Sequence, residues 1–497
     1  MQLVAYGAQD IYLTGNPQIT FFKIIYRRHT NFAMESIEQT FNGIADWGKK
    51  VTCTISRNGD LIYRVYLQVT LPRVECADSS SSCFRWVNYV GHVLIKSVEV
   101  QIGGQRIDKQ YGDWLTIWNE LTQEPGKQVG YDNMVGNTVA LTGHGMSVAE
   151  ATTLYVPLQF WFCRNPGLAL PLIALQYHEV KIDMEFRPKS ECYVSTSTVG
   201  NCGLNISGSD VFCIGSFEYA SLYVDYVYLD TDERRRFAQV SHEYLIEQLQ
   251  FTGDETVVST ASKVKLNFNH PVKELIWVLQ KEDHVAPNVN QWNNYTDDYD
   301  NDLDWTATST APTVAQSVAT NVESGYSAHS FPNTSGLGVT SSLTGGALNF
   351  PAGFGPGAAA QLAPTNFSAM TTAANGADHA GLGPRNAGRN PVVRAKLQLN
   401  GQDRFSERLG SYFNLVQPYQ HHTNVPATGI NVYSFALKPE EHQPSGSCNF
   451  SRIDNATLQL QVTTKTAAGN GARLRVYATN YNVLRIMSGM GGLAYSN

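Results

Sequence analysis

The chain has 497 residues, and 42% of them are hydrophobic, so it is long enough for two or three domains with cores of their own. Only 16% of the residues are charged, below the roughly 25% of typical soluble domains. The net charge of −7 argues against direct binding of nucleic acid, which requires a surplus of Lys and Arg.

The first 34 residues lack a clear period, and we expect residues 1–34 to form an extended N-terminal arm. The arm contains the basic cluster FFKIIYRRHTNF (21–32), in which Lys23, Arg27 and Arg28 are candidates for a contact surface. These cations are too few for strong electrostatic binding to nucleic acid or to an anionic membrane. Contact with a neighbouring protein subunit explains the cluster at least as well.

The first half of the chain then predicts eight strands, because apolar or alternating runs are separated by turn residues. These runs cover residues 36–43, 50–56, 60–71, 92–102, 154–162, 166–175, 179–186 and 217–230. Residues 113–123 (DWLTIWNELTQ) instead have apolar residues at helical spacing, with Asp113 as the expected N-cap. The charged segment 231–239 is interpreted as a connector to the second half.

The second half repeats the plan of the first. VEVQIGGQ (98–105) returns as AKLQLNGQ (395–402), so that Gln101 and Gln398 are 297 positions apart. Other segments follow in the same order as their counterparts. They cover residues 245–253, 263–269, 273–280, 394–402, 432–437, 444–453, 456–462 and 472–486.

Eight antiparallel strands in each half favour an all-β protein made of two consecutive jelly-roll domains, a double jelly roll, with long loops and few short helices. We expect the first jelly roll to cover residues 35–237 and the second to cover residues 238–497. Residues 283–392 are rich in Gly, Ala, Ser, Thr and Asn and have no counterpart in the first half. We expect this long insertion to be a surface elaboration of the second roll.

No arrangement of residues predicts catalysis, a metal site or a cofactor. His178 and His242 begin patterns like those of zinc proteases, but neither has a second His four residues later. His421 and His422 lack an evident third ligand and are interpreted as part of a polar loop. The acidic run from Asp297 to Asp304 departs from an EF-hand loop and is interpreted as solvated. The C-terminal SGMGGLAY (488–495) is expected to be a flexible tail.

The eight Cys residues include no C-x-x-C pair, which argues against structural zinc. Cys76 with Cys83, and Cys192 with Cys202, flank polar loops that a disulfide would be able to close. We expect reduced thiols instead, because the N-terminus has no signal peptide and the chain is expected to be synthesised in the cytosol. The sequence also has no run of about 18 apolar residues, so it predicts no transmembrane helix.

Several segments resemble the major capsid proteins of large nucleocytoplasmic DNA viruses, most closely those that infect algae. The resemblance covers nearly the whole chain and is highly specific. Its segments include the N-terminal residues 2–43, IGGQRIDK (102–109), PGLALPLIALQYHEVK (166–181), FAQVSHEYLIEQLQFTG (237–253), LNGQDRF (399–405), SFALKPEEHQPSGSCNFSRIDNATL (434–458) and YNVLRIMSGMGGLAY (481–495).

The resemblance implies a structural protein of the virion rather than an enzyme. It implies a homotrimer whose six similar lobes form a pseudo-hexagonal capsomer that tiles an icosahedral shell. Expected partners are neighbouring capsomers and minor capsid and penton proteins. The arm is expected on the inner side of the shell, near the internal viral membrane, and synthesis is expected in the host cytoplasm.

Related algal-virus capsid proteins are glycosylated on outer loops, so the sequons at Asn294, Asn333 and Asn366 in the insertion are candidate glycosylation sites. Sequons are also expected by chance in a chain this rich in Asn, Ser and Thr. Host glycans are a further candidate partner of the outer loops.

An alternative function is a carbohydrate-binding, lectin-like β-sandwich, since jelly rolls are common among lectins. In that case Trp292, Tyr295 and Trp305 of the insertion are the side chains expected to stack on sugar rings.

Overall fold

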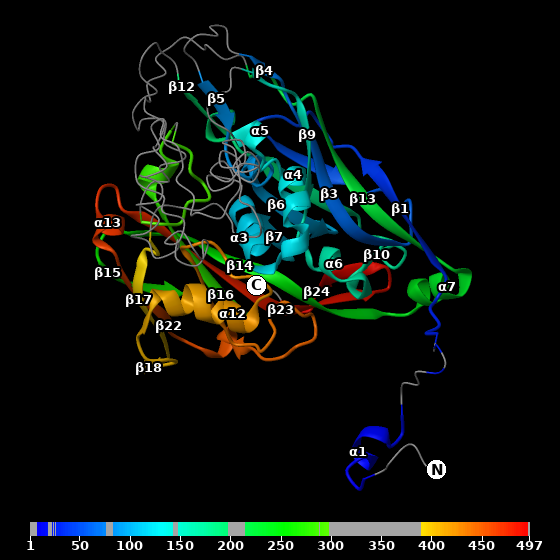
Figure 1. Cartoon of the computed structure of the whole chain (residues 1–497). Coiled ribbons are helices and arrows are strands. Elements are labelled where there is room, and N and C mark those ends of the chain that lie inside the picture. The colour runs from blue at the N-terminus through cyan, green and yellow to red at the C-terminus, as the bar shows by residue number, and fades with distance from the viewer. Residues whose placement is uncertain are drawn as a thin grey trace, which may run out of the picture.

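The structure is a computed structural model that describes residues 7–17, 22, 24, 26–75, 83–142, 148–196, 214–287, 289–297 and 389–495. In these ranges the chain consists mainly of antiparallel strands with short helices between them. Two sandwiches make up the body, and the segment around α1 (Ile11–Thr14) stands away from them (Figure 1). No helix in the described ranges is long and apolar enough to span a membrane.

The first sandwich packs two sheets around one core. One sheet has the order β1-β13-β3-β10, with β9 also paired to β3, and the other has the order β2-β11-β6-β7. The strands are β1 (Phe32–Gln39), β2 (Lys50–Thr54), β3 (Leu61–Leu71), β6 (Ile95–Ile102), β7 (Gln105–Tyr111), β9 (Thr152–Pro157), β10 (Leu170–Pro171), β11 (Val180–Phe186) and β13 (Tyr219–Leu229).

The second sandwich has sheets of order β14-β23-β16-β20 and β15-β22-β17-β18. Three short strands extend them: β21 pairs with β16, β24 with β23, and β19 with β17. The strands are β14 (His242–Val257), β15 (Ala261–Leu266), β16 (Pro271–Lys281), β17 (Val392–Leu399), β18 (Gln402–Asp403), β19 (Arg408–Leu409), β20 (Ile430–Ser434), β21 (Cys448–Asn449), β22 (Ala456–Val462), β23 (Ala472–Met487) and β24 (Met490–Leu493).

The two sandwiches arrange their strands in the same way. The order β1-β13-β3-β9 returns as β14-β23-β16-β20, and β2-β11-β6-β7 returns as β15-β22-β17-β18. Both are the order of a jelly roll, so the predicted double jelly roll is confirmed. We refer to the two sandwiches as the first and the second roll.

The repeated GGQ and NGQ segments form the same hairpin in each roll. Ile102 pairs with Gln105 across the first turn, and Leu399 pairs with Gln402 across the second. Gly103 and Gly104 have positive φ angles of 59° and 82°, and Asn400 and Gly401 have angles of 51° and 81°. Two successive positive φ angles are typical of a two-residue type I′ turn, which favours Gly and Asn.

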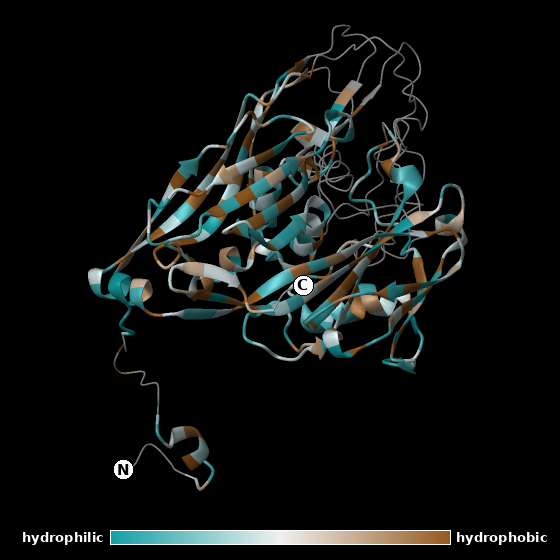
Figure 2. Ribbon diagram, turned by 180° about the vertical axis from the view of Figure 1, so that it is seen from behind, coloured by the Kyte–Doolittle hydropathy of each residue, from teal (hydrophilic) through white to brown (hydrophobic). Residues whose placement is uncertain are grey.

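Each roll has its own core, built by side-chain alternation along the strands. On β3 the side chains of Val65, Leu67 and Val69 face the core of the first roll, whereas Arg64 and Tyr66 face outward. Figure 2 shows the resulting alternation of hydrophobic and hydrophilic residues along the strands. This period of two is what made most strands visible in the sequence.

The helices agree in part with the expectations. The predicted helix at 113–123 is α3 (Gly112–Thr122), but Asp113 is not its N-cap, since Tyr111 occupies that position. The predicted strand 154–162 is wrong beyond Pro157, where the chain turns into α6 (Trp161–Arg164). The charged connector is a helix, α7 (Thr231–Gln239), whose N-cap Asp230 accepts a hydrogen bond from the Thr231 N–H.

The remaining elements are short. The helices are α2 (Val90–Leu94), α4 (Gln128–Val135), α5 (Val139–Thr142), α12 (Gln417–His421), α13 (Thr464–Ala467), the π-helical turn η6 (Tyr412–Val416), and the 3-10 turns η1 (Pro125–Lys127), η2 (Pro166–Leu168), η3 (Lys189–Glu191), η4 (Glu282–Val285) and η7 (Phe450–Arg452). The strands are β4 (Val74–Glu75), β5 (Cys83–Trp86), β8 (Val148–Ala149) and β12 (Tyr193–Thr196).

The C-terminal residues are not the flexible tail that was expected. Met490–Leu493 form β24, which pairs antiparallel with the end of β23. The hairpin also contacts the first roll, because the Tyr177 N–H donates to the Gly489 carbonyl at 3.0 Å and His178 Nδ1 lies 3.0 Å from the Gly491 carbonyl. The glycines of this segment therefore belong to a hairpin that joins the two rolls.

Candidate functional site: contacts between and around the rolls

One of the contacts between the rolls is made by α3 of the first roll. Its side chains Trp114, Ile117, Trp118 and Leu121 form one buried cluster with residues on the outer face of the second roll. Those residues come from β16, β20 and β23: Ile276, Val278, Ile430, Val432 and Tyr477. The apolar face of α3, visible in the sequence as a helical period, is thus covered by the other half of the same chain.

A buried ion-pair network lies at the start of α3. The carboxylate of Asp113 pairs with Arg475 of β23 and, at 3.4 Å, with Arg187. Arg475 also pairs with Asp254 at 2.9 Å. Burial lowers the pKa of the Arg475 guanidinium, but Asp113 and Asp254 outweigh that effect and raise it. The network therefore fixes α3 to the second roll.

A second buried ion pair connects the rolls through Glu247 on β14. One of its oxygens lies 3.1 Å from Arg164 of the first roll, and the other lies 2.7 Å from the fully buried Lys273. The Arg164 guanidinium also stacks on the Trp118 ring at 3.9 Å. Arg164 therefore links the ion pair with Glu247 to the apolar cluster of α3, which includes Trp118.

Polar groups on β7 and β14 also join the rolls, next to Glu247 on β14. The Leu249 N–H donates to the Asp108 carboxylate at 3.0 Å, and the Gln248 amide donates to the Ile107 carbonyl. Burial raises the pKa of Asp108 to about 6 even though several donors lower it. A polar groove of about 570 Å³ runs along this junction.

The start of the insertion is not the surface elaboration that was expected. Trp292 is 7% exposed, and its ring stacks on the Arg187 guanidinium at 4.0 Å. Tyr295 is 1% exposed and belongs to the same cluster as α3. Neither ring is free to stack on a sugar, so the residues expected for a lectin form core instead. Trp305 lies outside the described residues.

Asn294 does not fit the prediction that it is glycosylated. Its side chain is 2% exposed, its amide group donates to Gln291, and its carbonyl oxygen accepts from Thr296. A glycan on this nitrogen would have no room in the folded chain. The other two candidate sites, Asn333 and Asn366, lie outside the described residues.

Asp297 closes the base of the insertion instead of joining a solvated acidic loop. Its carboxylate accepts from the Arg389 N–H at 2.8 Å, and its own N–H donates to the Arg389 carbonyl at 3.0 Å. These two residues are 92 positions apart in the sequence. The rest of the acidic run lies outside the described residues.

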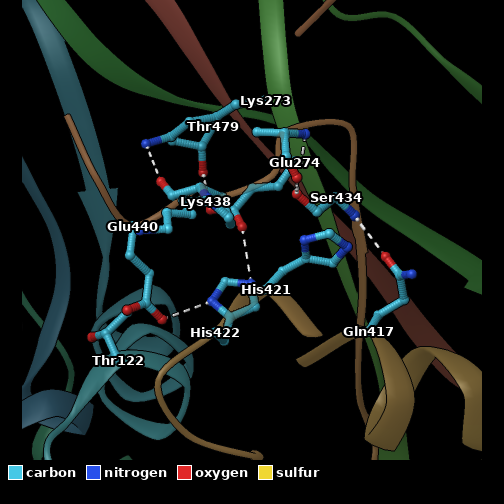
Figure 3. Close-up of polar contacts among 12 residues, drawn as sticks. Thr122, Lys273, Glu274, Gln417, His421, His422, Ser434, Lys438, Glu440 and Thr479 are labelled. Atoms are coloured by element: carbon cyan, nitrogen blue, oxygen red, sulfur yellow. Dashed lines mark hydrogen bonds and ion pairs between the residues drawn. The ribbon is translucent and has the colours of Figure 1, made fainter. Parts of the chain in front are cut away.

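His422 is not part of a polar loop but the centre of a buried ionic cluster (Figure 3). Its side chain is fully buried between two carboxylates, with Nε2 3.2 Å from Glu274 and Nδ1 2.9 Å from Glu440. Glu274 on β16 also accepts from the Thr479 hydroxyl at 3.1 Å. Glu440 also accepts from the Thr423 N–H at 2.8 Å. The cluster therefore fixes the segment after α12 to β16.

The two carboxylates keep His422 charged. Burial lowers the pKa of the imidazole, but the contacts with Glu274 and Glu440 raise it to about 9. Burial raises the pKa of Glu274, and its contacts with His422 and Lys273 reverse that effect and lower it. With one His and two carboxylates at its two nitrogens, this is an ion pair and not a metal site.

The described residues hold no group of three or more His, Cys, Asp or Glu side chains suited to a metal ion. His178 contacts the C-terminal hairpin, and His242 Nε2 lies 2.9 Å from the Phe237 carbonyl. Both histidines are thus engaged in contacts within the chain.

Cys53, Cys163, Cys192 and Cys448 are free thiols. Burial raises the pKa of Cys192 to about 12, and its thiol donates to the Pro188 carbonyl. Its potential disulfide partner Cys202 lies outside the described residues, as does Cys76.

The arm is the most exposed part of the described chain. No residue of α1 is buried, and Ile11, Tyr12 and Leu13 are open to solvent. Arg27 and Arg28 are exposed as well, and Lys23 lies outside the described residues. Of the three predicted contact residues, the described part of the chain therefore shows Arg27 and Arg28 on an exposed segment.

The sequence analysis did not predict the residues that form the ion pairs between the rolls. Asp113 and Arg475 are 362 positions apart, so no local pattern connects them. The one available signal was an Asp in the first turn of an apolar helix, which is equally typical of an N-cap.

Residues 20–230 match the family described as the major capsid protein N-terminus, and residues 233–492 match the large eukaryotic DNA virus major capsid protein family. The major capsid protein of Phaeocystis pouchetii virus is 54% identical, and the alignment covers 100% of this chain and 99% of the relative. That of Paramecium bursaria Chlorella virus 1 is 42% identical with the same coverage.

Solved structures agree with these matches. The crystal structure of the PBCV-1 capsid protein, fitted into a reconstruction of the Sputnik virophage, aligns with a TM-score of 0.66 at 36% identity. It covers 96% of this chain and 100% of the solved chain. A quasi-atomic model of the PBCV-1 capsid gives a TM-score of 0.64 at 37% identity, with the same coverage.

Proposed function

The chain belongs to the major capsid proteins of large eukaryotic DNA viruses, a family of structural proteins, and we propose that three copies form the capsomer that tiles an icosahedral virion shell. The observation that carries the proposal is the duplication: each chain contains two rolls with the same strand order. Three chains then supply six similar lobes, and a ring of six lobes fits a lattice position with six neighbours.

We add to this proposal the bounds of the domains and the position of the arm, which the family match does not give. We assign residues 1–34 to the arm, 35–237 to the first roll and 238–497 to the second. We place the arm on the inner side of the shell, as the family resemblance implies, and its exposed apolar and basic side chains are available for a contact there. There Arg27 and Arg28 face minor capsid proteins or the headgroups of the internal membrane.

The insertion is proposed to decorate the outer surface, on three of the six lobes. Asn333 and Asn366 remain the proposed glycosylation sites, and host glycans the proposed ligands of the outer loops. Penton proteins are proposed partners at the vertices. Synthesis is proposed in the host cytoplasm, as for a protein that assembles inside the infected cell.

The proposal is tested by the mass of the purified protein. Size exclusion with light scattering at micromolar concentration should give three times the 54.8 kDa chain, about 164 kDa. A monomer would contradict the proposal. Electron microscopy of assembled material should show hexagonally packed tiles.

A separate variant tests the arm. Deletion of residues 1–30 should leave the trimer intact, because β1 begins at Phe32, but should abolish binding to vesicles that contain anionic lipid or to minor capsid proteins. If the truncated trimer bound the vesicles and the minor capsid proteins as well as the full chain does, the arm would not be their contact surface.

A further inference from the structure

Each roll has one helical segment at an equivalent place in its strand order. The first residue of each segment packs against the start of an equivalent strand, β6 in the first roll and β17 in the second. In the first roll α3 begins at Gly112, and in the second the segment that includes η6 and α12 begins near Gly410, 298 positions later. A Cβ at Gly112 would overlap the carbonyl oxygen of Ile95, the first residue of β6. A Cβ at Gly410 would overlap that of Val392, the first residue of β17. The two segments are therefore structural counterparts.

The same offset of 298 aligns the two sequences, although Tyr412–Val416 form a π-helical turn where α3 is α-helical. Leu115 corresponds to Phe413, and each is buried in the core of its own roll. Three residues of α3 that contact the second roll, Ile117, Trp118 and Leu121, correspond to Leu415, Val416 and Tyr419. These three counterparts are 40%, 40% and 81% exposed. The second roll thus has an apolar helix face in the place where the first roll buries one.

The exposed face extends onto neighbouring segments. Leu437 is 72% exposed, and its carbonyl lies 3.0 Å from Nδ1 of His421, at the end of α12. Leu409 immediately precedes the segment and is exposed as well. Several exposed apolar side chains on neighbouring segments are typical of an interface with another protein.

We propose that Leu415, Val416 and Tyr419 pack against the first roll of a second copy, repeating between chains the contact that α3 makes within one chain. The inference rests on the proposed trimer and identifies the surface that holds it together. Each copy then donates one helix face and accepts one.

The accepting surface follows from the strand register. Leu67 pairs with Leu222 in the first roll as Leu279 pairs with Leu474 in the second. In the same alignment Tyr66 corresponds to Val278, and Tyr223 corresponds to Arg475. In the second roll Val278 belongs to the cluster that covers α3, and Arg475 pairs with Asp113 of α3.

Tyr66 and Tyr223 are paired on the outer face of β3 and β13, and both remain partly exposed. Tyr is enriched at protein interfaces because its ring buries a large area while its hydroxyl forms a hydrogen bond. A tyrosine surface opposite Leu415 and Tyr419 suits a contact that forms between separately folded chains.

Such a contact is head-to-tail, because the donating and accepting surfaces differ. Head-to-tail contacts form a ring if their rotation closes and a filament if it does not. Around a ring of six lobes, contacts within a chain alternate with contacts between chains. Such a ring closes with three copies of the chain.

The donating surface is tested with the double variant Leu415→Glu/Tyr419→Glu in the full-length chain. We expect loss of the trimer peak in size exclusion with light scattering, with the far-ultraviolet circular dichroism of the wild type. Val258→Glu is the control, because Val258 is 66% exposed in the turn between β14 and β15, and it should remain trimeric. Tyr66→Glu, on the accepting surface, should dissociate the trimer as well.

A double variant that remains a trimer at the wild-type concentration would overturn the inference while leaving the proposed function intact. A monomeric wild type would instead contradict the proposed function itself.

A second measurement avoids destabilising charges. In the trimer, Tyr419→Cys should react with a maleimide at least about tenfold more slowly than Val258→Cys, because burial denies the reagent access to the thiol. Equal rates of labelling would also overturn the inference, and this result does not depend on whether the glutamate variants fold.

Discussion

At the scale of single residues, His422 shows how a charge is stabilised inside the second roll. The imidazole lies between Glu274 and Glu440, so the cluster has a net negative charge that Lys273 next to Glu274 helps to balance. Each of these groups would be costly to bury alone, because a charge without a partner in a low-dielectric interior loses its hydration. The cluster is stable only as a unit.

Replacing His422 by Gln should therefore lower the free energy of unfolding by about 3 kcal/mol, since a buried ion pair that loses one member leaves an uncompensated charge. Urea unfolding followed by tryptophan fluorescence measures the change. His421→Gln is the matched control, with an expected change of less than about 0.5 kcal/mol. Equal unfolding midpoints for the two variants would contradict this account.

The stabilisation by this cluster should depend on pH in a defined way. The pKa of His422 is raised from 6.5 to about 9, so its contribution is complete below pH 6.5 and is lost as the pH rises through about 9. The pKa of Glu274 is lowered from 4.5, so its contribution is present above pH 4.5 and is lost in more acidic solution. The difference in stability between wild type and His422→Gln should thus be largest between pH 4.5 and 6.5. A difference that stays constant up to pH 10 would contradict it.

Asp113 has a comparable role at the interface between the rolls. Asp113→Asn leaves Arg187 and Arg475 without their shared counter-charge, and we expect a loss of about 3 kcal/mol in the free energy of unfolding. Glu124→Gln is the control, because its ion pair with Lys127 is largely open to solvent, and such pairs contribute less than about 1 kcal/mol. Similar losses for both variants would argue against a special role of the buried network.

At the scale of elements, most strands could be predicted from the sequence because their side chains alternate between core and surface. β11 and β22 are examples, and the repeated hairpin was visible because its turns require Gly or Asn. The run 154–162 misled because nearly all of its residues are apolar, so the sequence shows no period that separates β9 from α6, although Tyr155 in β9 is exposed.

The contacts of the candidate site were much harder to predict. A helical period shows that α3 has an apolar face but does not show what covers it. Trp292 and Tyr295 lie in a segment of loop-like composition, and only the packing of that segment against Arg187 and α3 reveals them as core. Contacts between residues hundreds of positions apart depend on the tertiary fold, for which one sequence has no local signal.

The equivalence of the two helical segments predicts parallel effects of one substitution. Gly112→Ala and Gly410→Ala each place a methyl group against a backbone carbonyl, and overpacking of this kind costs roughly 1–3 kcal/mol. We expect both variants to lower the thermal midpoint. Gly130→Ala is the control for a crowding effect, because nothing lies within 4 Å of the Cβ position at Gly130 and its φ angle is not positive. A tolerated Gly410→Ala would contradict the proposed equivalence.

At the scale of the whole molecule, the insertion is attached through a closed base. Because Asp297 and Arg389 bond to each other, residues 299–387 should be replaceable by a short Gly/Ser linker without loss of the trimer. The shorter loop should stabilise the chain by roughly 2 kcal/mol, since each halving of loop length lowers the closure entropy cost by about 0.6 kcal/mol. Thermal unfolding and light scattering check both points. A shortened chain that fails to form trimers would assign the insertion an assembly role.

The α3 contact within each chain also has a kinetic consequence. Six separate lobes would form a ring only through five successive encounters, each of which costs about 4–15 kcal/mol in translational and rotational freedom. Because peptide bonds hold the two rolls together, their mutual contact forms at a high effective concentration before any other copy arrives. Ring closure then requires two encounters. The protein should therefore assemble at far lower abundance early in infection than single-roll subunits with the same surfaces.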